Sequence, residues 1–134
     1  MKDVWRVLDI KTDEDVLRAR QAGRDLAREM GLGTADQTRL ATAISELTRN
    51  VLKYAGEGIC SIVAEDELKT HRINVKVEDH GPGIPDIDSA LEQGFTTGGG
   101  LGAGLPGTRR LVDVFNIQSC PGSTVVSISM IRPK

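Results

Sequence analysis

Two neighbouring parts of this chain differ in the spacing of their apolar residues, which is helical in one and strand-like in the next. The first part carries two stripes that recur every third or fourth residue, along Val16, Ala19, Gly23, Leu26, Ala27 and Met30 and then along Leu40, Ala43, Ile44, Leu47, Val51 and Tyr54. Such stripes predict two consecutive amphipathic helices. Residues 58–64 and 72–78 instead alternate apolar and polar side chains, as half-buried strands do. Helices followed by hairpins predict an α+β fold, with helices on one face of a mixed, mostly antiparallel sheet.

Capping and turn residues set the expected ends of these elements. Thr12 is expected to cap the first helix, and residues 34–37 fit a capping box that would begin the second. The remaining pattern predicts a first strand, two shorter helices and a second hairpin that turns at Pro121 and Gly122, at residues 4–10, 85–93, 104–115, 116–119 and 123–131. A chain of 134 residues can build one core, so we expect a single domain, 1–134.

Composition narrows the classes of partner and compartment. The net charge of −2 argues against nucleic acid or an anionic membrane as a partner. The sequence has no apolar run of membrane-spanning length, and its first residues lack the apolar segment of a signal peptide. Cys60 and Cys120 do not form a metal-type pair, so we expect ordinary core or strand thiols and a cytoplasmic location.

The second predicted helix carries a polar stripe beside its apolar one. Glu46, Asn50 and Lys53 fall on one side of the helix, at the expected rim of the core. A carboxylate there can orient or deprotonate a hydroxyl nucleophile, a carboxamide oxygen suits Mg²⁺, and a lysine can meet a phosphate. The alternative is a solvated helix face with salt bridges.

A second candidate segment follows the strand predicted at residues 72–78. Asp79 is expected at the end of this strand, where a carboxylate can accept a hydrogen bond from the exocyclic amine of adenine. Gly81 and Gly83 then allow the backbone to bend close to a base. The alternative is a simple turn that joins a strand to a loop. His80 is interpreted as a loop residue.

A third candidate segment is rich in glycine. Five of the residues 98–104 are glycines, and their exposed amides can form an anion-binding concavity. A helix that begins near Gly104 would point its positive end at the same place. The alternative is a flexible linker. Residues 102–107 match G-x-G-x-x-G formally but lack the preceding strand of a dinucleotide-binding unit, and the sequence contains no P-loop motif.

Together these segments resemble the GHKL (Bergerat-fold) ATP-binding superfamily of gyrase, Hsp90, histidine kinases and MutL. The matching motifs are Asn50-x-x-Lys53, Asp79-x-Gly81-x-Gly83, residues 100–105, and Gly122-Ser123-Thr124. The resemblance implies a two-layer α/β sandwich, ATP and Mg²⁺ as cofactors, Glu46 as the catalytic residue and Asn50 as the metal ligand. It implies nucleotide contacts from Asn50, Lys53, Asp79, Gly81, Gly83, Thr97, Gly98, Gly99, Gly100, Leu101, Gly102, Ala103, Gly104, Leu105 and Thr124.

Longer segments resemble one group within that superfamily, the small bacterial serine/threonine kinases that control sigma factors by partner switching. These segments are residues 19–24, 42–50, 79–87 and 94–107, and the glycine-rich stretch favours the switch-kinase branch. The resemblance implies a kinase that phosphorylates a STAS-domain antagonist, then binds and activates a PP2C-type phosphatase, with a stressosome-like assembly as context. The alternatives are an anti-sigma factor kinase, a non-catalytic nucleotide-gated binding module and a stand-alone ATPase. A histidine-kinase fragment is disfavoured, because neither His71 nor His80 lies in a helical phosphoacceptor motif.

Overall fold

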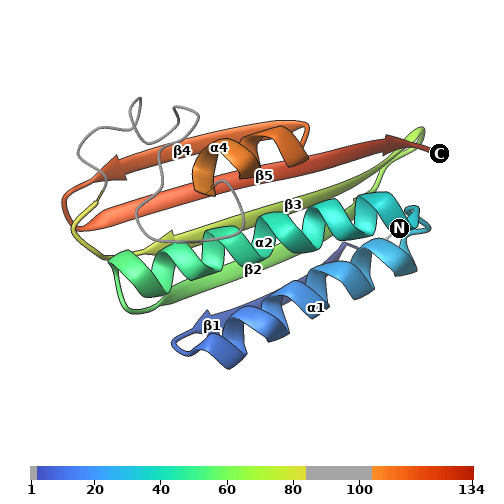
Figure 1. Ribbon diagram of the computed structural model, residues 1–134. Helices are drawn as coiled ribbons and strands as arrows, with labels where there is room; N and C mark the ends of the chain where they lie inside the picture. Colours follow the sequence, from blue (N-terminus) through green and yellow to red (C-terminus); the bar gives the residue numbers. More distant parts are fainter. Residues whose placement is uncertain (1–2, 84–103) are drawn as a thin grey trace.

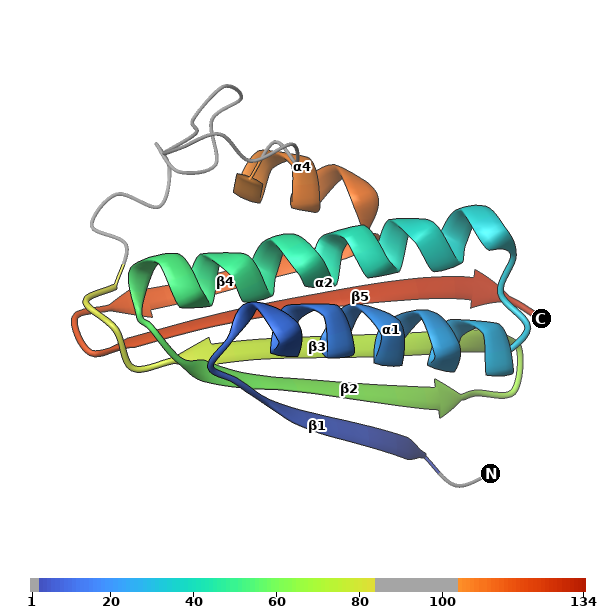
Figure 2. The same ribbon diagram turned by 60° about the horizontal axis from the view of Figure 1, so that its bottom comes forward.

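The computed structural model describes residues 3–83 and 104–134, which form a layer of helices on a layer of strands (Figure 1). The helices are α1 (Asp13–Glu29), α2 (Thr34–Tyr54) and α4 (Gly104–Leu111). The strands are β1 (Val4–Ile10), β2 (Gly58–Asp66), β3 (Thr70–Asp79), β4 (Val114–Cys120) and β5 (Ser123–Pro133). Figure 2 shows the helices above one face of the sheet. The predicted α+β sandwich is therefore confirmed.

The described strands form one sheet in the order β1-β2-β3-β5-β4. Every neighbouring pair is antiparallel, so this part of the chain has no parallel pairing of the kind that a mixed sheet would contain. β3 lies at the centre and pairs with β2 and β5, which brings the middle of the chain beside its C-terminal end.

The core lies between the helices and the covered face of the sheet. Its largest fully buried side chains are aliphatic, as the low aromatic content requires: Ile10, Leu26, Leu40, Ile44, Leu47, Ile62, Ile73, Val75, Ile128 and Met130. Gly23 lets α1 approach α2 closely, because a Cβ at this position would lie 2.2 Å from Cδ1 of Ile44. Cys60 belongs to this core, and burial raises the pKa of its thiol to about 12, whereas Cys120 is exposed at the end of β4.

The two long helices begin at the expected residues, but only the first is capped as predicted. Thr12 caps α1 as predicted: its Oγ1 accepts a hydrogen bond from the Asp15 amide at 3.3 Å, and the Asp15 carboxylate accepts one from the Thr12 amide at 3.1 Å. The capping box predicted at residues 34–37 is wrong. Gly33 is the N-cap of α2 without a side-chain bond, and Gln37 Nε2 donates to the carbonyl of Leu32 at 2.9 Å.

The helix predicted at 104–115 is shorter than expected, because the chain has already joined the sheet edge at Asp113. The Asp113 amide donates to the Ser129 carbonyl at 3.0 Å, and Asp113 Oδ2 accepts from the Ile131 amide at 2.6 Å. α4 therefore ends at Leu111, and Phe115 belongs to β4. The second hairpin turns at Pro121 and Gly122 as predicted, with Gly122 at φ 93°. The helix predicted at 85–93 lies outside the described residues.

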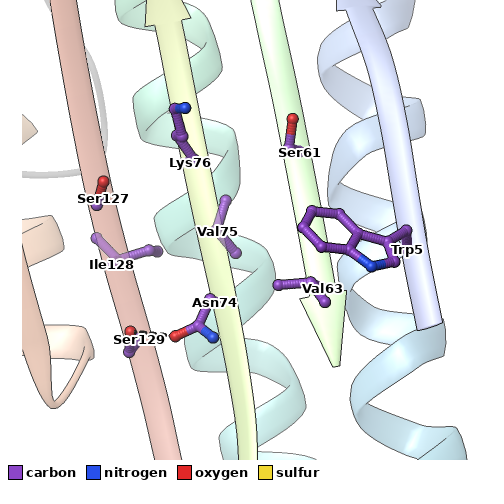
Figure 3. Close-up of a pocket in the computed structure, with 9 residues that line it drawn as sticks. All are labelled: Trp5, Ser61, Val63, Asn74, Val75, Lys76, Ser127, Ile128 and Ser129. Atoms are coloured by element: carbon purple, nitrogen blue, oxygen red, sulfur yellow. Dashed lines mark hydrogen bonds between the residues drawn. The ribbon is translucent and has the colours of Figure 1, made fainter. Parts of the chain in front are cut away.

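The face of the sheet away from the helices carries a shallow hollow of about 350 Å³ (Figure 3). The exposed Trp5 lies beside its register partner Val63 at one side of it, and Asn74 Oδ1 accepts a hydrogen bond from Ser129 Oγ at 2.6 Å within it. No helix in the described ranges, 3–83 and 104–134, is long and apolar enough to cross a membrane.

Candidate functional site

Asp79 and Thr124, which are distant in sequence, are paired across the central strands β3 and β5. Gly58 pairs with Asp79 on the β2 side, and Ser119 pairs with Thr124 on the β4 side, so one row crosses four strands. Paired residues of antiparallel strands project to the same face. Since Val77 is buried in the core two residues before Asp79, this row faces the helix layer.

Glycine lets the backbone pack closely around Asp79. A Cβ on Gly58 would lie 2.5 Å from the Glu78 carbonyl oxygen, 2.7 Å from Val51 of α2 and 3.3 Å from the Asp79 Cβ. The Gly81 amide donates to Asp79 Oδ1 at 2.9 Å, which turns the chain directly after β3. Asp79 itself is partly exposed, so its carboxylate is accessible at the strand end.

The loop after Asp79 packs between the end of α2 and the β4–β5 turn. A Cβ on Gly81 would lie 2.6 Å from the Cβ of Ala55, immediately after α2. The Gly81 carbonyl accepts a hydrogen bond from the Gly122 amide at 3.0 Å. Gly83 has φ 85°, and a Cβ there would lie 2.5 Å from the Cys120 carbonyl oxygen. These contacts bring the last turn of α2, the Asp79 loop and the start of β5 to one end of the molecule (Figure 1).

The polar stripe of α2 runs from the core to the surface. Glu46 is buried, with 7% of its surface exposed, and its Oε1 accepts a hydrogen bond from Arg49 Nη1 at 3.1 Å. Asn50 is half-buried, and Lys53 is exposed with its ammonium 5.4 Å from the centroid of the Tyr54 ring. The stripe therefore combines a shielded carboxylate with a carboxamide and a cation nearer to solvent.

The structure thus places seven of the sixteen predicted site residues on elements that meet. Glu46, Asn50 and Lys53 lie on α2, and Asp79, Gly81, Gly83 and Thr124 lie at the adjoining end of the sheet. Gly104 begins α4 as expected, and Leu105 contributes to the core. The remaining predicted contacts lie outside the described residues: Thr97, Gly98, Gly99, Gly100, Leu101, Gly102 and Ala103.

Sequence reasoning missed two residues around Asp79 and Thr124. Gly58 is required because β2 lies close to β3 and α2 at this point, and Ser119 Oγ lies 2.7 Å from Thr124 Oγ1. Their local sequence carries no distinguishing pattern. Only the strand register identifies them, because it pairs Gly58 with Asp79 and Ser119 with Thr124.

Comparison with known proteins finds a matching family and similar proteins. Residues 35–132 match the family described as histidine kinase-, DNA gyrase B-, and HSP90-like ATPase. The serine/threonine-protein kinase RsbT of Bacillus subtilis is 50% identical over 113 residues, which cover 84% of this chain and 85% of that protein. The anti-sigma F factor of Bacillus licheniformis is 30% identical over 95 residues, which cover 66% of this chain and 65% of that protein.

A solved structure supports the same fold. The crystal structure of the RsbU and RsbW domains of a Mycobacterium tuberculosis protein matches with a TM-score of 0.68, covering 99% of this chain and 33% of that one. At 17% sequence identity this likeness concerns the fold alone.

Proposed function

Because the chain belongs to the histidine kinase-, DNA gyrase B- and HSP90-like ATPase family, we propose that it is an ATP- and Mg²⁺-dependent protein serine/threonine kinase of a partner switch, with residues 1–134 as a single nucleotide-binding domain. The 50% identity with a serine/threonine-protein kinase over most of both chains supports kinase activity. The observation that carries the proposal for the site is the pairing of Asp79 with Thr124 beside the last turn of α2.

The proposed substrate is a serine or threonine on a STAS-domain antagonist. Once released from the antagonist, the kinase would bind and activate a PP2C-type phosphatase, within a stressosome-like assembly in the cytoplasm. The resemblance of residues 42–50 and 79–87 to switch kinases supports these partners.

ATP would lie between α2 and the covered face of the sheet. The Asp79 carboxylate, an acceptor only, suits the exocyclic amine of adenine, and the hydroxyl of Thr124 lies on the adjacent strand. The amides of residues 98–104, together with Lys53, would neutralise the phosphates. This arrangement positions the nucleotide, which is the main demand of phosphoryl transfer.

The residues present fit a Mg²⁺ ion that is held largely by the phosphates of ATP. Among the described residues no group of three or more His, Cys, Asp or Glu side chains could hold a metal. Mg²⁺ is usually bound by one or two protein oxygens together with substrate phosphates and water, and the half-buried Asn50 carboxamide offers such an oxygen. The ion would supply charge neutralisation at the phosphates.

Glu46 is the proposed catalytic base. Its carboxylate would take the proton of the acceptor hydroxyl as the hydroxyl oxygen attacks the γ-phosphorus, and the bond from that phosphorus to the bridging oxygen would break to release ADP. Burial of Glu46 and its bond to Arg49 hold the carboxylate in one place before substrate arrives.

The decisive experiment is a transfer assay with γ-labelled ATP and a purified STAS-domain antagonist. Label on a serine or threonine of the antagonist is expected. Tight ATP binding without transfer would support the non-catalytic module instead, and turnover without a protein acceptor would support a stand-alone ATPase.

The anti-sigma alternative has its own support, since one relative at 30% identity is an anti-sigma factor. Pulldown with a STAS antagonist, a sigma factor and a PP2C-type phosphatase separates the two branches. Our proposal expects capture of the antagonist and the phosphatase, and capture of the sigma factor would favour the alternative.

A further inference from the structure

Ser119 and Thr124 form a hydroxyl pair at the edge of the candidate site. The two residues are register partners on β4 and β5, and their hydroxyl oxygens are 2.7 Å apart. Thr124 is buried, with 7% of its surface exposed, and Ser119 is half-buried. Phe115 and Ile117 of the same strand pack against the core, and strand alternation places Ser119 on their face, toward the helices. The pair therefore lies on the same face as Asp79.

The position of Ser119 is fixed by the loop that follows Asp79. A Cβ on Gly83 would lie 3.2 Å from Ser119 Oγ, so this loop packs directly against the hydroxyl. The bond from the Gly122 amide to the Gly81 carbonyl holds the loop and the β4–β5 turn together. Ser119 is thus placed between the Asp79 loop and the Thr124 hydroxyl.

A hydroxyl can rotate, and it offers one donor and two acceptor sites. The short contact with Ser119 restricts that rotation for Thr124, whose branched side chain is already stiff at χ1. If Asp79 holds the base as a hydrogen-bond acceptor, a second group beside Asp79 must direct its own hydrogen bond at the base. A Thr124 hydroxyl that is fixed in advance costs less ordering on binding than a free one.

We propose that Ser119 is a positioning residue for adenine recognition, which orients the Thr124 hydroxyl toward the base beside Asp79. This inference rests on the proposed function, because the base is that of ATP. Ser119 acts through Thr124, so its removal affects nucleotide affinity and selectivity while the phosphoryl-transfer groups on α2 stay in place.

The test compares magnesium-ATP affinity by calorimetry for the wild type and three variants. Ser119→Ala should weaken ATP and ADP binding by the same factor, about five- to tenfold, the usual effect of losing one hydrogen bond. Ser119→Thr keeps a hydroxyl and should restore most of the affinity. Gln118→Ala is the matched control, because this neighbouring side chain is exposed and strand alternation points it to the open face of the sheet.

Two readouts separate positioning from a structural role. KM for ATP should rise by the factor seen in binding while kcat is preserved, and the preference for ATP over GTP should narrow. Ser119→Cys keeps the shape of the side chain with a slightly larger atom and a weaker hydrogen bond, and it replaces the alanine variant if that variant does not fold. ATP affinity within twofold of wild type in the alanine or cysteine variant would overturn the inference. Failure of the wild type itself to bind ATP would instead overturn the proposed function.

Discussion

Arg132, near the end of β5, forms a forked ion pair with Asp36 in the first turn of α2. Its Nε and Nη2 donate to the two carboxylate oxygens at 2.9 and 3.0 Å. The same guanidinium donates through Nη1 to Asp113 Oδ2 at 2.7 Å. One partly buried cation therefore joins the start of α2, the end of the sheet and the segment that follows α4.

Removing this fork should destabilise the fold. Asp36→Ala is expected to lower the free energy of unfolding by about 1–2 kcal/mol, as for a charge-assisted bond with partial solvent access. Asp25→Ala is the matched control. Asp25 pairs with Arg28 at 3.1 Å on the exposed side of α1, where such pairs contribute about 0.5 kcal/mol or less. Urea denaturation at neutral pH measures both, and equal losses would contradict the special role of Asp36.

The fork also predicts a pH dependence. The side-chain hydrogen bond from Arg132 is the main cause that lowers the pKa of Asp36 below its ordinary value of 3.8. The folded state therefore binds this proton more weakly than the unfolded state. The stabilisation is complete above the unfolded pKa and is lost as pH falls below 3.8 through the folded pKa. The free energies of unfolding of the wild type and Asp36→Ala should therefore approach each other as pH falls below 3.8, and a constant difference between them would refute the assignment.

Asp79→Asn should strongly weaken nucleotide binding while the fold is retained. The Gly81 amide donates to Asp79 Oδ1 at 2.9 Å, so it should hold the single oxygen of the asparagine and leave the NH2 group facing the adenine amine. Two donors would then oppose each other, so we expect a loss of at least about tenfold in ATP affinity. Glu78→Gln is the control, since Glu78 pairs with Lys76 at 3.3 Å and strand alternation directs it to the open face. Calorimetry should separate the two variants. Unchanged ATP affinity in Asp79→Asn would remove the adenine role.

Gly58→Ala should disturb both the fold and the site. The new Cβ would meet a backbone carbonyl at 2.5 Å, which cannot move aside as a flexible side chain can, so a destabilisation of about 1–3 kcal/mol is expected with weaker ATP binding. Gly33→Ala is the comparison. Nothing lies within 4 Å of its added Cβ, and only the modest cost of an alanine N-cap, about 1 kcal/mol or less, applies. Equal ATP affinity in the two variants would argue against a site role for Gly58.

The elements that the sequence predicted correctly are those fixed by local chemistry. Thr12 and Asp15 are close in sequence, so their reciprocal cap is readable directly. β2 and β3 followed from alternation because one face of each packs against the helices. Phe115 was wrongly placed in a helix because its neighbours also suit a helical pattern. α4 ends earlier because the Asp113 amide bonds to the carbonyl of Ser129, which lies on β5 and is not close in sequence.

The candidate site residues also differ in how far the sequence alone can suggest them. Glu46, Asn50 and Asp79 were predicted because each lies in a motif whose chemistry is local. Ser119 and Gly58 were not, since their relation to Asp79 and Thr124 exists only through the register of four strands. Sequence spacing cannot reveal such a relation, because register depends on packing and turn geometry along the whole sheet.

Glu46→Gln provides the last test, because it separates binding from chemistry. Glutamine keeps an oxygen that can accept the bond from Arg49 at 3.1 Å, so the fold and ATP affinity should change little. It cannot accept a proton as a base, and general-base residues contribute about 10²- to 10⁴-fold, so kcat for phosphorylation of the antagonist should fall within that range. Arg49→Gln serves as the control for loss of the ion pair alone and should retain more activity than Glu46→Gln. Full kinase activity in Glu46→Gln with normal ATP binding would show that the hydroxyl is activated by another group.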